Sequence, residues 1–188
     1  MIRIEEIREE ADYPGYRVLI VATLDKTHQT LKIDITTGDS VTPKAIEFPF
    51  RLMFEDRYIN IWTYNLETIL AEKFETIITR GITTSRMRDF YDIFILTNTR
   101  TYDAEIFNDA LKNTVIKRGT IKQMASIDTV IQMVTTSTIL IELWQRYQKK
   151  FTYAAEVSWD KAIEALGNLR KTLNFDIFTP HDTKFHDF

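Results

Sequence analysis

The pattern of this sequence changes from strand to helix at Tyr64-Asn-Leu-Glu-Thr-Ile-Leu-Ala-Glu-Lys-Phe-Glu-Thr-Ile-Ile-Thr-Arg80. Apolar residues recur there at helical spacing, and Lys73 shares their face because it lies three, four and seven residues after Leu70, Ile69 and Leu66. A buried ammonium group without a partner is strongly disfavoured. We therefore expect carboxylates or a phosphate to converge on Lys73. The alternative is a lysine that lies along the apolar surface and keeps its ammonium group in water.

The segment Arg86-Met-Arg-Asp-Phe-Tyr-Asp92 offers such carboxylates shortly after this helix. Asp89 and Asp92 are three residues apart and so share one face of a predicted helix. The alternative is that they are helix N-terminal acids after Ser85 as an N-cap, with Arg86 and Arg88 as salt-bridge partners. That alternative suits Asp92 less, because it lies a turn further into the helix.

Asp34 is a third candidate, in the alternating segment Thr30-Leu-Lys-Ile-Asp-Ile-Thr36. It lies on the polar side of this predicted strand, opposite Leu31, Ile33 and Ile35. One interpretation is the solvent face of a half-covered sheet. The other is a rigidly placed carboxylate for Mg²⁺, which prefers one or two carboxylates together with substrate phosphates.

The composition of the chain argues against several classes of function. The chain has 188 residues with a net charge of −3, which argues against broad, non-specific nucleic-acid binding. It has no cysteine, so disulfides and thiolate chemistry are excluded, and its three scattered histidines (His28, His181 and His186) argue against a zinc site. The N-terminus does not resemble a signal peptide and no segment is apolar enough to span a membrane, so we expect a cytoplasmic protein.

The predicted fold class is α+β, a sheet followed by a helical C-terminal half. We expect a core region over residues 1–98, a helical region over 99–174 and an irregular tail over 175–188. Predicted strands cover 17–24, 30–36, 45–50 and 58–62, with a turn at 25–29, and predicted helices cover 64–80, 86–98, 103–117, 127–150 and 159–171.

The order of these segments and the residues in them resemble those of a known family. Asp34 with Thr36-Thr-Gly-Asp-Ser-Val-Thr-Pro43, then Tyr64-x-Leu-Glu-x-Ile-Leu-Ala-Glu-Lys73, then Arg86-Met-Arg-Asp-Phe-Tyr-Asp92-Ile, is similar to the AbiEii/AbiGii nucleotidyltransferase toxins. The resemblance is close over residues 15–98. It implies a partial polymerase-β-like nucleotidyltransferase sheet followed by helices, in the toxin of an abortive-infection toxin–antitoxin pair.

The resemblance also implies roles for individual residues. Lys73 would contact NTP phosphates, and Asp89 would hold or polarise the reacting group. Asp34 would be a metal-binding acid, and Asp92 would anchor its helix. Thr79, Arg86 and Arg88 would contact substrate. The implied cofactors are NTP and Mg²⁺, and the implied partners are tRNA or another RNA and a cognate antitoxin from the same operon.

Two motifs that the resemblance implies are missing from this sequence. The chain contains no Gly-Gly or Gly-Ser pair to hold a triphosphate and no Asp-x-Asp strand to bind two metals. We therefore expect a fragment or split-gene product, a degenerate homologue, or a chain complemented by another polypeptide. In each case the isolated chain is expected not to transfer nucleotides. A sheet edge and apolar face left uncovered would favour a homodimer.

Two other function classes stay open. The first is a non-catalytic nucleotide- or RNA-binding module, favoured by the basic segment Lys112–Lys122 and by Arg146, Lys149 and Lys150. Solvated helix faces are the alternative explanation of these charges. The second is a structural protein in which Lys73 forms a buried ion pair with Asp89 or Asp92.

Overall fold

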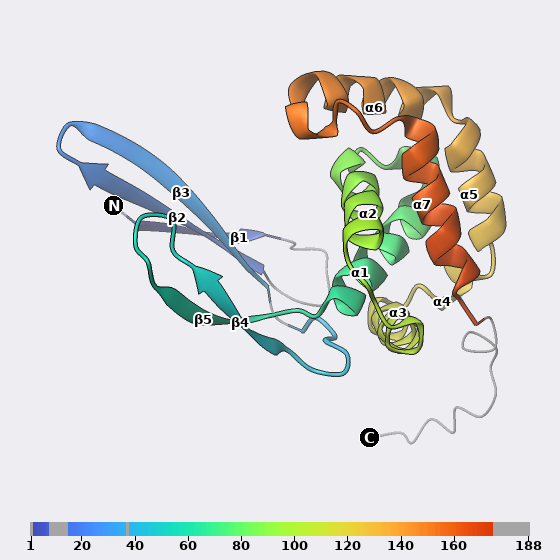
Figure 1. Cartoon of the computed structure of the whole chain (residues 1–188), viewed down its shortest axis with the longest axis horizontal. Helices are drawn as coiled ribbons and strands as arrows, with labels where there is room; N and C mark the ends of the chain where they lie inside the picture. The colour runs from blue at the N-terminus through green and yellow to red at the C-terminus, as the bar shows by residue number, and fades with distance from the viewer. Residues whose placement is uncertain (1, 8–14, 37, 175–188) are drawn as a thin grey trace. The chain divides into compact units, whose positions relative to one another are not determined.

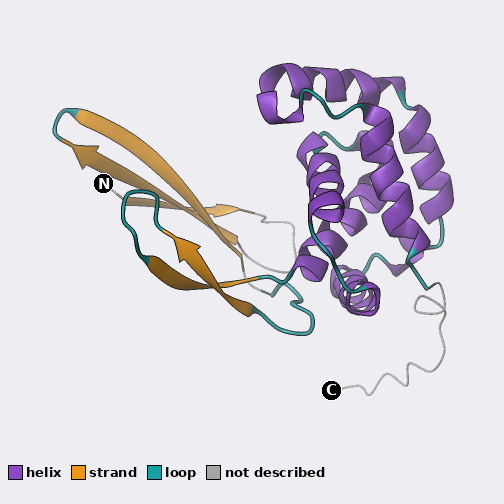
Figure 2. Ribbon diagram, in the orientation of Figure 1, coloured by secondary structure: helices purple, strands orange, loops and turns teal. Residues whose placement is uncertain are grey.

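The structure is a computed structural model that describes residues 2–7, 15–36 and 38–174. The chain divides into two compact units, residues 1–39 and 40–188. Figure 2 shows that the described helices all belong to the second unit. Strands followed by helices make the fold α+β, as predicted. The expected boundary at residue 98 lies within the second unit, and the tail over 175–188 lies outside the described residues.

The first unit is an antiparallel sheet in the order β1-β2-β3, formed by Ile2–Ile7, Gly15–Leu24 and Thr27–Thr36. The predicted five-residue turn is wrong, because β3 already begins at Thr27 and only two residues connect β2 to β3. Asp25 there has a φ of 52°, which aspartate tolerates better than most residues. The register aligns Val18 with Ile33 and Arg17 with Asp34, so apolar and polar residues alternate across the sheet.

The second unit opens with the hairpin of β4 (Ile46–Arg51) and β5 (Tyr58–Thr63). Its register places Phe48 opposite Ile61 and Phe50 opposite Ile59, which gives the hairpin one apolar face. These four side chains are exposed. The hairpin therefore carries apolar side chains that are between 37% and 48% exposed.

The helices follow in chain order and are labelled in Figure 1. They are α1 (Leu66–Arg80), α2 (Met87–Thr99), α3 (Ala104–Arg118), α4 (Ile121–Met124), α5 (Ile127–Thr136), α6 (Thr138–Lys150) and α7 (Trp159–Lys171), with short 3₁₀ turns η1 (Gly81–Thr83) and η2 (Thr152–Ala154). α1 packs against α2 and α3, and α7 packs against α2. One hydrophobic core joins them, centred on Phe74, Phe90, Phe107, Trp144 and Leu166.

The prediction of one helix over 127–150 was wrong, because the helix is interrupted at Ser137. Ser137 has extended backbone angles, and its hydroxyl accepts a hydrogen bond from the backbone N–H of Leu140. The serine thereby caps α6 and ends α5, as expected where hydroxyl side chains compete for backbone groups. Ser85, in contrast, is not the N-cap of α2; Arg86 takes that position without a side-chain cap.

Candidate functional site

Lys73 lies on α1 beside the core of the second unit. Its helix neighbours Leu70, Phe74 and Ile77 are fully buried and fix the rotation of α1. The ammonium group of Lys73 reaches α2, where Nζ lies 3.1 Å from Oδ1 of Asp89 and 2.6 Å from Oδ2 of Asp92. Two carboxylates thus converge on one lysine, which is the arrangement that its place on an apolar face requires.

This three-residue cluster is half-buried. The side chains of Lys73, Asp89 and Asp92 keep 21%, 12% and 21% of their exposure. α2 presents both acids toward α1 because residues three apart share a helix face. Partial burial lowers the local dielectric constant, so these charges attract each other more strongly than exposed pairs do. A solvent-facing ligand can still approach the ammonium group.

Two arginines border the cluster on its exposed side. Arg86 lies 4.0 Å from Oδ2 of Asp89, and Arg88 lies 3.7 Å from Oδ2 of Asp92. Their side chains are 53% and 77% exposed, so these long contacts restrain them weakly. Three cations against two carboxylates leave the group of five with one net positive charge. That balance favours an anion.

Oδ2 of Asp89 is buried without a hydrogen-bond partner among the described residues. The guanidinium of Arg86 lies 4.0 Å from it, a distance too long for a hydrogen bond. A buried carboxylate oxygen without a donor carries a desolvation penalty. Asp89 is therefore the less well compensated of the two acids at its Oδ2.

Thr79 belongs to a different cluster. Its hydroxyl donates to the carboxylate of Glu75 at 2.8 Å, and the hydroxyl of Thr120 donates to the same oxygen at 2.9 Å. Arg118 donates to the other oxygen of Glu75, whose side chain is almost fully buried. The structure therefore does not place Thr79 in the Lys73 cluster. Glu75 at the centre of this second cluster joins α1 to Arg118 at the end of α3 and to Thr120.

Glu75 is a residue that the sequence reasoning missed. The spacing that singled out Lys73 does not mark Glu75, because the residues three, four and seven positions before it are Glu72, Ala71 and Thr68, yet Glu75 is buried. Arg118 was counted only as part of the basic segment Lys112–Lys122. In the structure it pairs with Glu75 and, at 3.5 Å, with Glu72, so its charge is largely neutralised.

Asp34 lies in the first unit, whereas Lys73 lies in the second. Its two carboxylate oxygens accept hydrogen bonds from Nε and one terminal nitrogen of Arg17, at 2.7 and 2.9 Å. The pairing across β2 and β3 raises the pKa of Arg17, through the hydrogen bond first and the negative charge of Asp34 second. This geometry is that of a bidentate surface ion pair.

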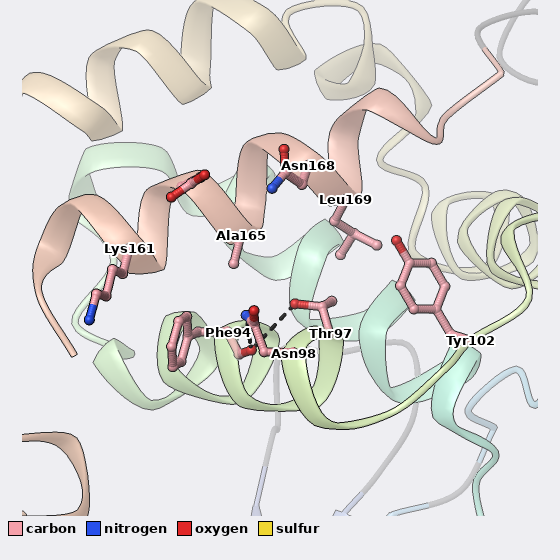
Figure 3. A pocket seen from close by; sticks show the side chains of 9 residues that line it. Phe94, Thr97, Asn98, Tyr102, Lys161, Ala165, Asn168 and Leu169 are labelled. Atoms are coloured by element: carbon pink, nitrogen blue, oxygen red, sulfur yellow. Dashed lines mark hydrogen bonds between the residues drawn. The ribbon is translucent and has the colours of Figure 1, made fainter. Parts of the chain in front are cut away.

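A groove of about 430 Å³ lies elsewhere, between α2 and α7 (Figure 3). Phe94, Ala165 and Leu169 contribute apolar surface, and Asn98 and Asn168 contribute amides from opposite sides. Asn98 and Thr97 both donate hydrogen bonds to the carbonyl of Phe94 in their own helix. None of the predicted site residues lines this groove.

Comparison with known families identifies the family of this chain. The family model described as nucleotidyl transferase AbiEii toxin, type IV toxin–antitoxin system, matches residues 1–165. The chain belongs to the AbiEii family. This confirms the resemblance, and it extends the match well beyond residues 15–98 into the helical region. Searches of curated proteins and of solved structures found no match.

AbiEii membership makes the chain a member of a nucleotidyl transferase toxin family, and a toxin–antitoxin system implies an antitoxin as functional partner. No helix in the described ranges is long and apolar enough to cross a membrane.

The residues of this AbiEii chain do not fit the magnesium ions implied by the resemblance. Asp34, the predicted metal ligand, has both oxygens engaged by Arg17. Within residues 2–7, 15–36 and 38–174, no three histidine or acidic side chains gather as a metal site. Asp89 and Asp92 are instead joined through Lys73, a cation that takes the place a metal would need.

Proposed function

We propose that this AbiEii-family chain binds the phosphates of an NTP at Lys73. The observation that carries the proposal is the half-buried lysine held by two carboxylates on one helix face, with two exposed arginines beside it. Lysine is a compact point charge suited to phosphate oxygens, and Arg86 and Arg88 can form bidentate contacts to the same anion. Asp92, with the shorter contact, keeps Nζ in position while phosphate oxygens approach from the exposed side.

Asp89 is proposed to face the acceptor in nucleotide transfer. In that reaction an acceptor hydroxyl attacks the α-phosphorus of the NTP, and the bond from this phosphorus to the oxygen that bridges to the β-phosphate breaks. Pyrophosphate leaves, and the hydroxyl proton passes to a base. The support for Asp89 as that base is its place beside Lys73, where its carboxylate accepts a hydrogen bond from the ammonium group at 3.1 Å and its side chain keeps 12% exposure.

The proposed acceptor is RNA, and tRNA is the expected class from the resemblance. Arg146, Lys149 and Lys150 support it, because they lie exposed toward the end of α6. We also propose that this chain alone does not complete the transfer. That part rests on the sequence, which lacks the Asp-x-Asp pair that would bring metal-borne charge stabilisation. The antitoxin is proposed to come from the same operon.

A structural ion pair is the second candidate role, and the short contacts of Lys73 favour it directly. The two roles differ in what happens when Lys73 is replaced together with one of its acids. If the cluster is only structural, replacing Lys73 and Asp92 together removes their ion pair and has no other effect. If it binds phosphate, the double variant folds but loses the ligand.

The test is calorimetric binding of inorganic triphosphate and of ATP to the full chain, without a metal ion. Lys73→Met is expected to abolish binding, and so is Lys73→Met with Asp92→Asn, which removes one charge of each sign. Lys161→Met is the matched control, because Lys161 is an exposed lysine of α7 outside the cluster. Binding that persists at wild-type strength in the folded double variant would overturn the proposal.

A further inference from the structure

Beside the Lys73 cluster lies a group of aromatic rings that phosphate binding does not use. The aromatic patch is formed by Tyr91 of α2, Tyr147 of α6, Phe151 between α6 and η2, and Tyr153 of η2. Ring centroids are 4.9 Å apart for Tyr91 and Tyr153, and 4.8 Å apart for Tyr147 and Phe151. The rings of Phe151 and Tyr153 are the most nearly parallel pair within the patch, at 32°.

Hydrogen bonds and a buried indole hold the patch in place. The hydroxyls of Tyr147 and Tyr153 are 2.9 Å apart, and the hydroxyl of Tyr91 donates to the backbone carbonyl of Tyr153 at 3.2 Å. Below them the buried Trp144 packs against Tyr147, with centroids 5.5 Å apart. The polar ends of the three tyrosines are thereby engaged, yet Tyr153 remains 51% exposed. The patch is thus a preorganised ring surface open to solvent.

The patch adjoins the Lys73 cluster. Tyr91 and Asp92 are consecutive residues of α2, and Asp92 is the closer partner of Lys73. Tyr91 in turn packs against Tyr147, with ring centroids 6.4 Å apart. Burial raises the pKa of Tyr147, so its phenol stays neutral. The patch and the Lys73 cluster therefore share the helix α2.

The charges around the patch favour an anionic ligand with an aromatic part. Nζ of Lys150 lies 5.4 Å from the ring centroid of Phe151, and Lys149 is exposed beside it. Arg146 is exposed too, with an ion pair to Glu142 at 3.8 Å. Cations beside exposed rings are the combination with which proteins hold nucleotides, because the rings stack on bases and the cations neutralise phosphates.

We propose that the aromatic patch stacks a nucleobase, with Tyr153 as the exposed contact ring. The proposal rests on the proposed function, because it places the base beside a nucleotide whose phosphate is held at Lys73. The base is either that of the NTP itself or a terminal base of the acceptor RNA, and the chemistry of stacking is the same for both. Stacking tolerates different bases, since every base has a π face.

The experiment compares ligands with and without a base, by calorimetry on the full chain. Inorganic triphosphate measures the phosphate contribution alone, whereas ATP, CTP and a single-stranded oligoribonucleotide add bases. Base-bearing ligands are expected to bind about 5- to 150-fold more tightly than triphosphate, the range that corresponds to stacking of one base. Tyr153→Ala should remove this gain without weakening triphosphate, and Tyr153→Phe should keep it. Tyr58→Ala, at an exposed tyrosine of β5, is the control.

A gain with ATP and CTP assigns the stacked base to the NTP, and a gain with the oligonucleotide alone assigns it to the RNA. Either result supports the patch as a base site. Equal binding of all ligands, or an equal loss of triphosphate binding in Tyr153→Ala, would overturn it. Failure of triphosphate to bind refutes the phosphate proposal instead, and the oligonucleotide comparison with Tyr153→Ala still decides the patch.

Discussion

The ammonium group of Lys73 lies closer to Asp92 than to Asp89. Its Nζ is 2.6 Å from Oδ2 of Asp92 and 3.1 Å from Oδ1 of Asp89. Asp92 is thus the main partner that holds the lysine, and Asp89 keeps one oxygen without a hydrogen bond. The two acids of one helix face therefore have different environments. That difference sets what each substitution should do.

Asp92→Asn is expected to destabilise the fold by about 1–2 kcal/mol, because it removes the closer counter-charge of a half-buried lysine. Asp89→Asn should cost less than Asp92→Asn, because Asp92 still lies 2.6 Å from Lys73 when the hydrogen bond from Lys73 to Oδ1 of Asp89 is weakened. Urea unfolding measures both. The same Asp89→Asn variant should bind triphosphate more tightly, because it removes a negative charge beside Lys73. Equal losses of stability in the two variants would contradict the assignment.

Thr79→Val is expected to lower stability by about 1–2 kcal/mol and to leave triphosphate binding unchanged, because its hydroxyl serves the buried Glu75. Thr79→Ser, which keeps the hydroxyl, is the matched control. Thermal unfolding and calorimetric titration give the two readouts. Weaker triphosphate binding in a fully stable Thr79→Val protein would instead support the predicted substrate contact.

Glu75→Leu should cost more than the change at Thr79. It leaves Arg118 without its buried partner and two hydroxyls without an acceptor. We expect a loss of about 3–4 kcal/mol in the free energy of unfolding. Glu72→Leu, on the same helix and at a longer distance from Arg118, is the comparison and should cost below about 1 kcal/mol. Similar costs for the two would show that burial of Glu75 contributes little.

Asp128 links α5 to α7 through two hydrogen bonds from Arg170, each of 2.7 Å. The hydrogen bonds, more than the charge of Arg170, hold the pKa of Asp128 below its ordinary value. A carboxyl whose pKa is lowered by folding adds stability above its unfolded pKa of about 3.9 and loses it as pH falls through the folded value. Because Asp128 is largely exposed, solvent screening limits the gain to about 0.5–1 kcal/mol. Asp128→Asn should lower stability at pH 7, and this loss should shrink as the pH falls below about 3.9, as followed by urea unfolding.

The apolar face of the β4–β5 hairpin is expected to drive self-association. Phe48, Phe50, Ile59 and Ile61 are exposed on one side of the two strands. Phe48→Lys with Ile61→Lys should shift the protein toward monomer in multi-angle light scattering, because it places charges at the centre of this face. Arg51→Lys, at the polar side of the same hairpin, should change nothing. A wild-type protein that is monomeric at all concentrations would contradict the expectation.

Sequence periodicity predicted the parts of this molecule that depend on local pattern. It identified the α+β order, the change of period near residue 64 and the meeting of Lys73 with carboxylates. It predicted one helix where the structure has α5 and α6, because the apolar spacing continues through Ser137. The capping hydrogen bond of Ser137, which separates the two helices, is a local polar contact that this spacing does not reveal. Strand β1 was not identified individually, since its pairing with β2 depends on a distant segment.

The candidate site was predictable only where the partners lie on neighbouring helices. Lys73, Asp89 and Asp92 are brought together by one α1–α2 pair, so spacing sufficed. The pairing of Asp34 with Arg17 depends on strand register, which the alternation of Lys32, Asp34 and Thr36 does not specify. The link from Thr79 to Thr120 needs α3 to fold back on α1, and no residue pattern reveals that contact.

Trp144 and Trp159, with ring centroids 5.7 Å apart, give the chain an intrinsic optical probe. Both indoles are buried and hydrogen-bonded to backbone carbonyls, whereas Trp62 on β5 is 75% exposed. All three tryptophans lie in the second unit, so emission reports on that unit alone. Acrylamide should quench the red-shifted emission of Trp62 first. The blue emission and near-ultraviolet dichroism of the indole pair should then follow the melting of α6 and α7, with no added label.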